Sequence, residues 1–360
     1  MTIPGAAGDA GPPVPDTDPS TEDAFERLLE ELSVSPSSRA QRNLYRSMLT
    51  TVRELARENT DVIDLKIADA ALAEMSEAFR VFRPFRAIKK ITIFGSARTA
   101  PDDPAYAHTR NLARSMAAAD WMVVTGAGPG IMAAGMEGAG TERSIGVNIR
   151  LPFEGPANTF IAQDPKLVEM RYFFTRKLML IKESDGYAVL PGGFGTLDEA
   201  FELLTLLQTG KAAPAPVVFL DIPGGNYWTD WDRFVERAVA IRGLISEQDR
   251  SLFTITDDID VATEELTGFY RNYQSSRWVG DLLVLRLLIA PSASELADIN
   301  SRFGDVVAGG VIRPTKPLPP ERTGNDHLDQ ARLALRFDKF HYGRLRQLID
   351  ALNQCTGDGA

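Results

Sequence analysis

Two glycine-rich turns in the sequence are candidates for holding an anionic group. One runs from Gly126 through Gly128 to Gly130, and the other from Pro191 to Thr196; each follows a short apolar run and precedes a segment of helical pattern. Backbone N–H groups at a helix start, together with the positive end of the helix dipole, attract phosphate. Glycine allows close approach and positive φ. The first turn is not the dinucleotide fingerprint, because its third glycine comes one residue early, and it could also be only a tight turn.

The second turn leads into two acidic residues, Asp198 and Glu199. Two interpretations of Glu199 are open. Thr196 and Glu199 fit the capping-box pattern, in which the glutamate only caps its helix; alternatively, its carboxylate faces a ligand. Neighbouring helical residues point about 100° apart, so Asp198 and Glu199 cannot both face one ligand atom. Glu199, Glu202 and Thr205 share a face by their spacing, which favours Glu199 as the functional acid and leaves Glu202 as a supporting candidate.

In combination, these motifs resemble the LOG family, the cytokinin-activating phosphoribohydrolases often mislabelled lysine decarboxylases. The resemblance covers about Ile91–Tyr270 and does not extend to the first 80 or so residues or to the C-terminal part. Ala127 departs from the family pattern by replacing a glycine. The segments that carry the resemblance are Phe94-Gly95-Ser96 (first strand and G-S turn), Gly126–Met132 (G-G-G-x-x-G-x-M), Arg176-Lys177 (R-K pair) and Pro191–Glu199 (P-G-G-x-G-T-x-x-E).

The resemblance implies a hydrolase of N-glycosyl bonds that releases free base and ribose 5-phosphate from AMP or cytokinin riboside monophosphates. It implies Arg176 and Glu199 as the catalytic pair, no metal or organic cofactor, and a homodimer or higher homo-oligomer. Cleavage builds positive charge on the ribose, which a nearby carboxylate stabilises while it orients or deprotonates water. Arg176 remains protonated and cannot be the base, but it can hold a ribose hydroxyl, the phosphate or Glu199.

The expected phosphate site is the row of N–H groups from Gly192 to Thr196, with those of Gly128 to Gly130 as a second candidate. A carrier of a phosphorylated ligand, similar to molybdenum-cofactor carriers, is the alternative function; it would need the glycine turns but not the Arg176–Glu199 pair. The residues expected to bind the substrate are Ser96, Gly128, Gly130, Glu154, Lys177, Gly192, Gly193, Gly195, Thr196 and Thr205.

Short apolar strands alternating with helices must position these residues, a pattern typical of an open parallel sheet with helices on both faces, a Rossmann-like α/β fold. Turns that end strands of such a sheet meet at one edge. The expected strands are 91–94, 121–124, 144–148, 187–190 and 217–220. The expected helices are 104–119, 131–138, 165–183, 196–209 and 227–242.

The regions outside this alternation have other patterns. Residues 1–20 are rich in Pro, Gly, Ala and Asp and are predicted to be disordered. Residues 21–88 form an N-terminal helical segment, with helices expected at 22–32, 38–58 and 61–83, before the nucleotide-binding domain at 89–270. A C-terminal α+β extension follows at 271–360, with strands expected at 281–289, 306–312 and 333–337 and helices at 293–303 and 342–352.

Composition limits the class of protein. The 360 residues carry a formal net charge of −10, which argues against non-specific nucleic-acid binding. A single cysteine, Cys355, excludes a disulfide framework, and three scattered histidines argue against a structural zinc site. Neither an apolar signal core nor an apolar run of membrane-spanning length is present, so a cytoplasmic protein without a membrane partner is expected.

Overall fold

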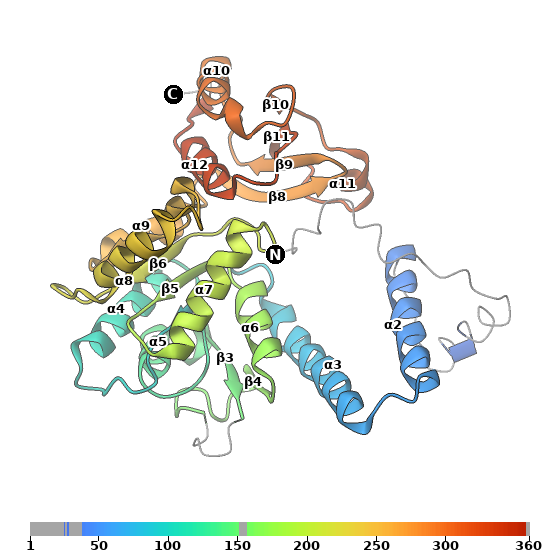
Figure 1. Cartoon of the computed structure of the whole chain (residues 1–360), viewed down its shortest axis with the longest axis vertical. Helices are drawn as coiled ribbons and strands as arrows, with labels where there is room; N and C mark the ends of the chain where they lie inside the picture. The colour runs from blue at the N-terminus through green and yellow to red at the C-terminus, as the bar shows by residue number, and fades with distance from the viewer. Residues whose placement is uncertain (1–24, 26, 29–37, 151–156, 358–360) are drawn as a thin grey trace. The chain divides into compact units, whose positions relative to one another are not determined.

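The computed structural model describes residues 25, 27–28, 38–150 and 157–357 (Figure 1). The described residues before Glu74 and those from Glu74 onward form two compact units. No helix in the described part of the chain combines the length and apolar character that a bilayer-spanning segment needs. The predictions for 1–20 and for most of 22–32 lie outside the described residues.

Two long helices precede the sheet, as the sequence predicts. They are α2 (Arg39–Arg57) and α3 (Val62–Phe82). The Ser38 hydroxyl accepts a hydrogen bond from the Gln41 N–H at 3.2 Å, which explains why α2 begins at this point. A short turn of 3-10 helix, η1 (Arg83–Phe85), then leads into the first strand.

A seven-stranded parallel sheet with helices on both faces confirms the predicted Rossmann-like class. Its strand order is β4-β3-β2-β1-β5-β6-β7, and all six pairings are parallel. The central strands are buried on both faces, which accounts for their nearly continuous apolar runs. The strands are β1 (Lys90–Phe94), β2 (Met122–Thr125), β3 (Ser144–Ile149), β4 (Leu167–Met170), β5 (Gly186–Val189), β6 (Val217–Leu220) and β7 (Thr254–Thr256).

Two apolar cores lie between the parallel sheet and its helices, one on each face of the sheet. One core packs the end of α3 with α6, α7 and α8 against one face of the sheet, and the other packs α4, α5 and α9 against the opposite face. Helix α8 continues into one turn of π-helix, Glu236–Ala240. The helices are α4 (Pro104–Ala118), α5 (Ile131–Ala139), α6 (Phe173–Lys182), α7 (Phe194–Gln208), α8 (Tyr227–Val235) and α9 (Ile259–Gly268).

The predicted helix at 165–183 is wrong in its first part. Residues Leu167–Met170 form the edge strand β4, which pairs with β3, and helix α6 starts only at Phe173. Val168 and Met170 are buried while Glu169 between them is exposed. That alternation has the period of a strand, but four residues are too few to stand out beside the helical pattern that follows.

The C-terminal part is a four-stranded antiparallel sheet packed on helices, in the order β10-β11-β9-β8 (Figure 1). The strand predicted at 333–337 is confirmed as β11, and the two helices predicted at 293–303 and 342–352 are confirmed as well. The strand predicted at 306–312 is wrong, because only an isolated bridge from Val307 to Phe337 forms there. The elements are β8 (Tyr273–Val279), β9 (Leu282–Leu287), α10 (Ala293–Phe303), β10 (Arg313–Pro314), α11 (Pro319–Thr323), β11 (Ala331–Leu335) and α12 (Tyr342–Leu352).

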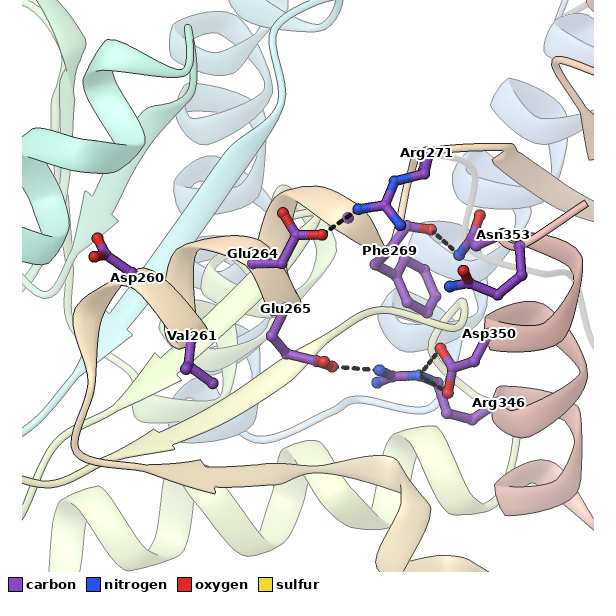
Figure 2. Close-up of a pocket in the computed structure, with 11 residues that line it drawn as sticks. Asp260, Val261, Glu264, Glu265, Phe269, Arg271, Arg346, Asp350 and Asn353 are labelled. Atoms are coloured by element: carbon purple, nitrogen blue, oxygen red, sulfur yellow. Dashed lines mark hydrogen bonds and ion pairs between the residues drawn. The ribbon is translucent and has the colours of Figure 1, made fainter. Parts of the chain in front are cut away.

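Arg346 links this C-terminal part to the parallel-sheet layer (Figure 2). It extends from α12, donates to Asp350 at 2.9 Å and pairs with Glu265 of α9. Its guanidinium carbon lies 4.9 Å from the centre of the Phe269 ring. Since Arg346 is only 6% exposed, loss of its acidic partners would leave a buried charge without compensation, which is destabilising.

Candidate active site

A cavity of about 860 Å³ opens at the carboxyl ends of the central strands. Its walls come from the turns after β1, β2 and β5 and from the facing sides of α6 and α7. The turn after β1 lies directly beside the turn after β5, because the Ser96 N–H donates to the Pro191 carbonyl at 3.3 Å. Ligands of open parallel sheets bind at this edge.

Arg176 and Glu199 meet inside this cavity. Arg176 comes from α6 and Glu199 from α7, and their Nη1 and Oε1 atoms are 3.3 Å apart. The two side chains are 9% and 14% exposed. Arg176 also donates through Nε to the Val147 carbonyl of β3 at 2.9 Å, so its guanidinium is fixed to the sheet and can in turn orient the carboxylate.

The Glu199 carboxyl has an unusual acidity. Burial raises its pKa to about 7, and the charges of Asp198 and Glu202 act in the same direction, while Arg176 and Lys177 oppose the rise. A carboxyl with this pKa exchanges its proton near neutral pH. Such a group can serve as a general base or acid, for which an ordinary glutamate is poorly matched.

Glu199 does not cap its helix. Helix α7 begins at Phe194, two residues before the predicted start, and Gly193 is its N-cap without a side-chain hydrogen bond. Thr196 is therefore the third helical residue, and Glu199 lies almost a turn further on. The capping-box interpretation of Glu199 is wrong, because the glycines carry the chain into the helix earlier than the Thr–Glu spacing indicates.

Gly126 leaves the space that the Arg176 guanidinium occupies. A Cβ atom added to Gly126 would lie 1.8 Å from Arg176 Nη2. Gly130 has a φ of +65°, and its added Cβ would lie 2.4 Å from the Ser96 carbonyl oxygen, which accepts the Ile131 N–H at 3.0 Å. Because its glycines carry no side chains, the first glycine turn leaves room for the Arg176 guanidinium and can contact the turn after β1.

Lys177 forms ion pairs across the two helices. Its Nζ lies 2.8 Å from Asp198 Oδ2 and 2.7 Å from Glu202 Oε2. Burial of the ammonium lowers its pKa, but the pairing with these two carboxylates outweighs burial and raises the pKa overall. Lys177 therefore joins α6 to α7 through two ion pairs. The carboxylate of Glu202 contacts Lys177 rather than supporting Glu199.

The structure brings most, but not all, of the predicted binding residues to the cavity. Gly128 and Gly130 are not among its lining residues, and Thr205 is exposed, with its hydroxyl donating to the Phe201 carbonyl at 2.7 Å. Glu154 lies outside the described residues. The predicted residues that line the cavity are Ser96, Arg176, Lys177, Gly192, Gly193, Gly195, Thr196 and Glu199.

Sequence reasoning missed Arg98 and Phe173 as lining residues, and it named Gly126 and Phe194 only as members of the two glycine turns. Gly126 and Arg98 belong to turns directly after β2 and β1, and Phe173 and Phe194 are the first residues of α6 and α7. In the sequence, their positions shortly after strands were the signal that could have identified them as lining residues. Across the described ranges, no group of three or more His, Cys, Asp or Glu side chains is arranged to hold a metal ion.

Comparisons with known proteins match this part of the chain. Residues 130–266 match the family model described as "Possible lysine decarboxylase". Two curated Arabidopsis thaliana proteins named cytokinin riboside 5′-monophosphate phosphoribohydrolase are 38% identical, over 99 residues (28% of this chain and 45% of that protein) and over 77 residues (21% and 34%). The chain thus spans less than half the length of these relatives.

Solved structures match about half of this chain at low sequence identity and low TM-score. A molybdenum cofactor carrier protein from Chlamydomonas reinhardtii is 22% identical, with a TM-score of 0.35 over 49% of this chain and 94% of that one. A molybdenum cofactor binding protein from Rippkaea orientalis is 18% identical, with the same TM-score and the same coverage. The resemblance to the LOG family is confirmed for the segment that carries Arg176 and Glu199, at modest identity.

Proposed function

We propose that this protein hydrolyses the N-glycosidic bond of nucleoside 5′-monophosphates, AMP or cytokinin riboside monophosphates, to free base and ribose 5-phosphate. The observation that carries the proposal is the Arg176–Glu199 pair, 3.3 Å apart in a cavity bordered by the start of α7. The match of residues 130–266, which include this pair, to the family model and the names of the curated relatives support the same reaction class.

Glu199 activates the water in the proposed reaction. The bond from ribose C1′ to the base nitrogen breaks, its electrons leave with the base, and positive charge develops on the sugar. The carboxylate stabilises that charge and accepts a proton from water, whose oxygen bonds to C1′. The departing base nitrogen takes up one proton, so the products together contain the atoms of one added water.

The phosphate binds where α7 begins. The first N–H groups of an α-helix have no intrahelical partner, and those of α7 follow Gly193 at the edge of the cavity. Added Cβ atoms at Gly193 and Gly195 would meet nothing within 4 Å, so the backbone is accessible there. The dipole of this 15-residue helix adds attraction for the dianion.

A panel of nucleoside monophosphates tests the proposal. The purified full chain is incubated with each of them, and free base and ribose 5-phosphate are measured by chromatography. We expect both products in equal amounts from at least one adenine-type monophosphate. Absence of turnover with every member, together with tight binding of a larger phosphorylated ligand, would favour the carrier function instead.

The proposed active form is a homo-oligomer, joined through the outer faces of α6 and α7. Phe174 and Leu178 on α6 and Phe201 on α7 are 54%, 40% and 41% exposed. The two helices are neighbours, as the ion pairs of Lys177 show. Phe174 and Leu178 are four residues apart and share one face of α6, and exposed apolar side chains that lie together are typical of association surfaces.

Replacing two of these side chains should separate the subunits. We expect the double variant Phe174→Ser, Leu178→Ser to elute as a monomer while the unaltered protein elutes as a dimer or larger, because the substitutions remove apolar area from the interface. Light scattering coupled to gel filtration measures both masses. Val261→Ser, an exposed apolar site on α9, is the control. A monomeric unaltered protein would contradict the oligomer, and an unchanged mass of the double variant would exclude this face.

A further inference from the structure

Arg98 is a cavity-lining cation that the catalytic pair does not use. It follows β1 in the turn Gly95-Ser96-Ala97-Arg98, and its side chain is exposed at the cavity. Its backbone N–H donates to the Ser96 hydroxyl oxygen at 3.1 Å. The turn that carries Arg98 is therefore fixed, while the guanidinium remains accessible to a ligand.

The ion pairs of the described cavity residues do not include the Arg98 guanidinium. Three cationic side chains line the cavity, Arg98, Arg176 and Lys177, against two carboxylates. Arg176 pairs with Glu199, and Lys177 pairs with Asp198 and Glu202. Among the described residues no side chain pairs with the Arg98 guanidinium, so this cation is available to an anion that enters the cavity.

The position of Arg98 places this charge near the start of α7. Strands β1 and β5 are adjacent and parallel, with Phe94 opposite Val189. The turns that follow them are joined by the hydrogen bond from Ser96 to the Pro191 carbonyl. An arginine two residues beyond Ser96 can therefore reach an anion held by the N–H groups at the start of α7.

We infer that Arg98 binds the 5′-phosphate of the substrate and thereby makes the site select phosphorylated over unphosphorylated nucleosides. This inference rests on the proposed function. A phosphate monoester carries a charge of about −1.5 to −2 at pH 7. A guanidinium binds two phosphate oxygens at once, whereas helix N–H groups supply only partial charge. Arg98 contacts the substrate away from the bond that breaks, so it acts on binding more than on the chemical step.

Arg98→Ala tests the inference by its effect on two substrates. We expect the KM for AMP to rise by about 10- to 100-fold, as for loss of a charged hydrogen-bonding group, with kcat changed by less than about threefold. For adenosine, which has no phosphate, kcat/KM should stay within about twofold. Arg98→Lys should recover part of the loss. Arg114→Ala, an exposed arginine of α4 that contacts Asn111, is the matched control and should not change either substrate.

Binding of ribose 5-phosphate separates this inference from the proposed reaction. Titration calorimetry needs no turnover: the unaltered protein should bind ribose 5-phosphate more tightly than ribose, and Arg98→Ala should remove most of the difference. Equal affinity of Arg98→Ala and the unaltered protein for ribose 5-phosphate would overturn the role of Arg98. Equal losses with AMP and adenosine would overturn it too. Failure of the unaltered protein to cleave any monophosphate would instead contradict the proposed reaction.

Discussion

Glu199→Gln should lose about 100- to 10,000-fold in kcat, the contribution expected of a positioned general base. The amide keeps the size of the side chain and can still contact Arg176, but it cannot accept a proton from water or carry the negative charge that stabilises the developing ribose cation. Substrate affinity should change by less than about threefold, since the phosphate contacts are untouched. Kinetics on the monophosphate cleaved best, with equilibrium binding to the variant, measure both effects.

Glu202→Gln is the matched control for this experiment. Glu202 lies one turn further along α7, does not line the cavity, and pairs with Lys177. Its substitution should leave kcat within about twofold. If Glu199→Gln retained more than about a third of the activity, the carboxylate would have no part in proton transfer or charge stabilisation of the size expected for either.

Arg176→Met should reduce kcat/KM by about 100-fold and shift the acidic limb of the pH profile to higher pH. In the proposed reaction, the unaltered protein should lose activity as the pH falls below about 7, because Glu199 must be ionised to act as a base and its pKa is about 7. Arg176 lowers that pKa. Without its positive charge the carboxylate is less favoured, the pKa rises further, and the acidic limb of the profile must shift to higher pH.

Arg176→Lys separates charge from geometry. It keeps the cation, so the limb should remain near its original pH, but it loses the two-sided contact with Glu199 and the Val147 carbonyl. We expect a loss of about tenfold in kcat/KM. Melting temperatures of both variants establish that they are folded. A limb that stays in place in a folded Arg176→Met protein would show that Glu199 does not govern the profile.

Strand positions and the parallel-sheet class could be predicted from the sequence because doubly buried strands are short apolar runs between glycine turns. Val217–Leu220 and the helices Ala293–Phe303 and Tyr342–Leu352 were predicted to the residue. Edge strand β4 and strand β8 were not, since β4 is short and adjoins a helical pattern, and most of the side chains of β8 are partly buried on both faces.

The predicted pair Arg176–Glu199 depended on the family resemblance, while local patterns misled. The Thr196–Glu199 spacing suggested a cap, but Gly193 starts the helix earlier. Lys177 was predicted to bind substrate, and at the cavity it already pairs with Asp198 and Glu202. Spacing along a helix shows which residues share a face, but it does not reveal their partners on the next helix. The ion pairs of Lys177 and the close approach of Gly126 to Arg176 could therefore not be predicted.

The joint between α9 and α12 restricts how this protein can be shortened. Asn353 accepts hydrogen bonds from the backbone of Asn272 and Tyr273 through its side-chain oxygen and donates to the Phe269 carbonyl. A protein truncated after residue 270 would leave the Phe269 ring, 3% exposed here, facing water and Glu265 without its arginine. The parallel-sheet part should therefore be poorly soluble when produced alone, because the C-terminal sheet and its helices cover a surface that would otherwise face water.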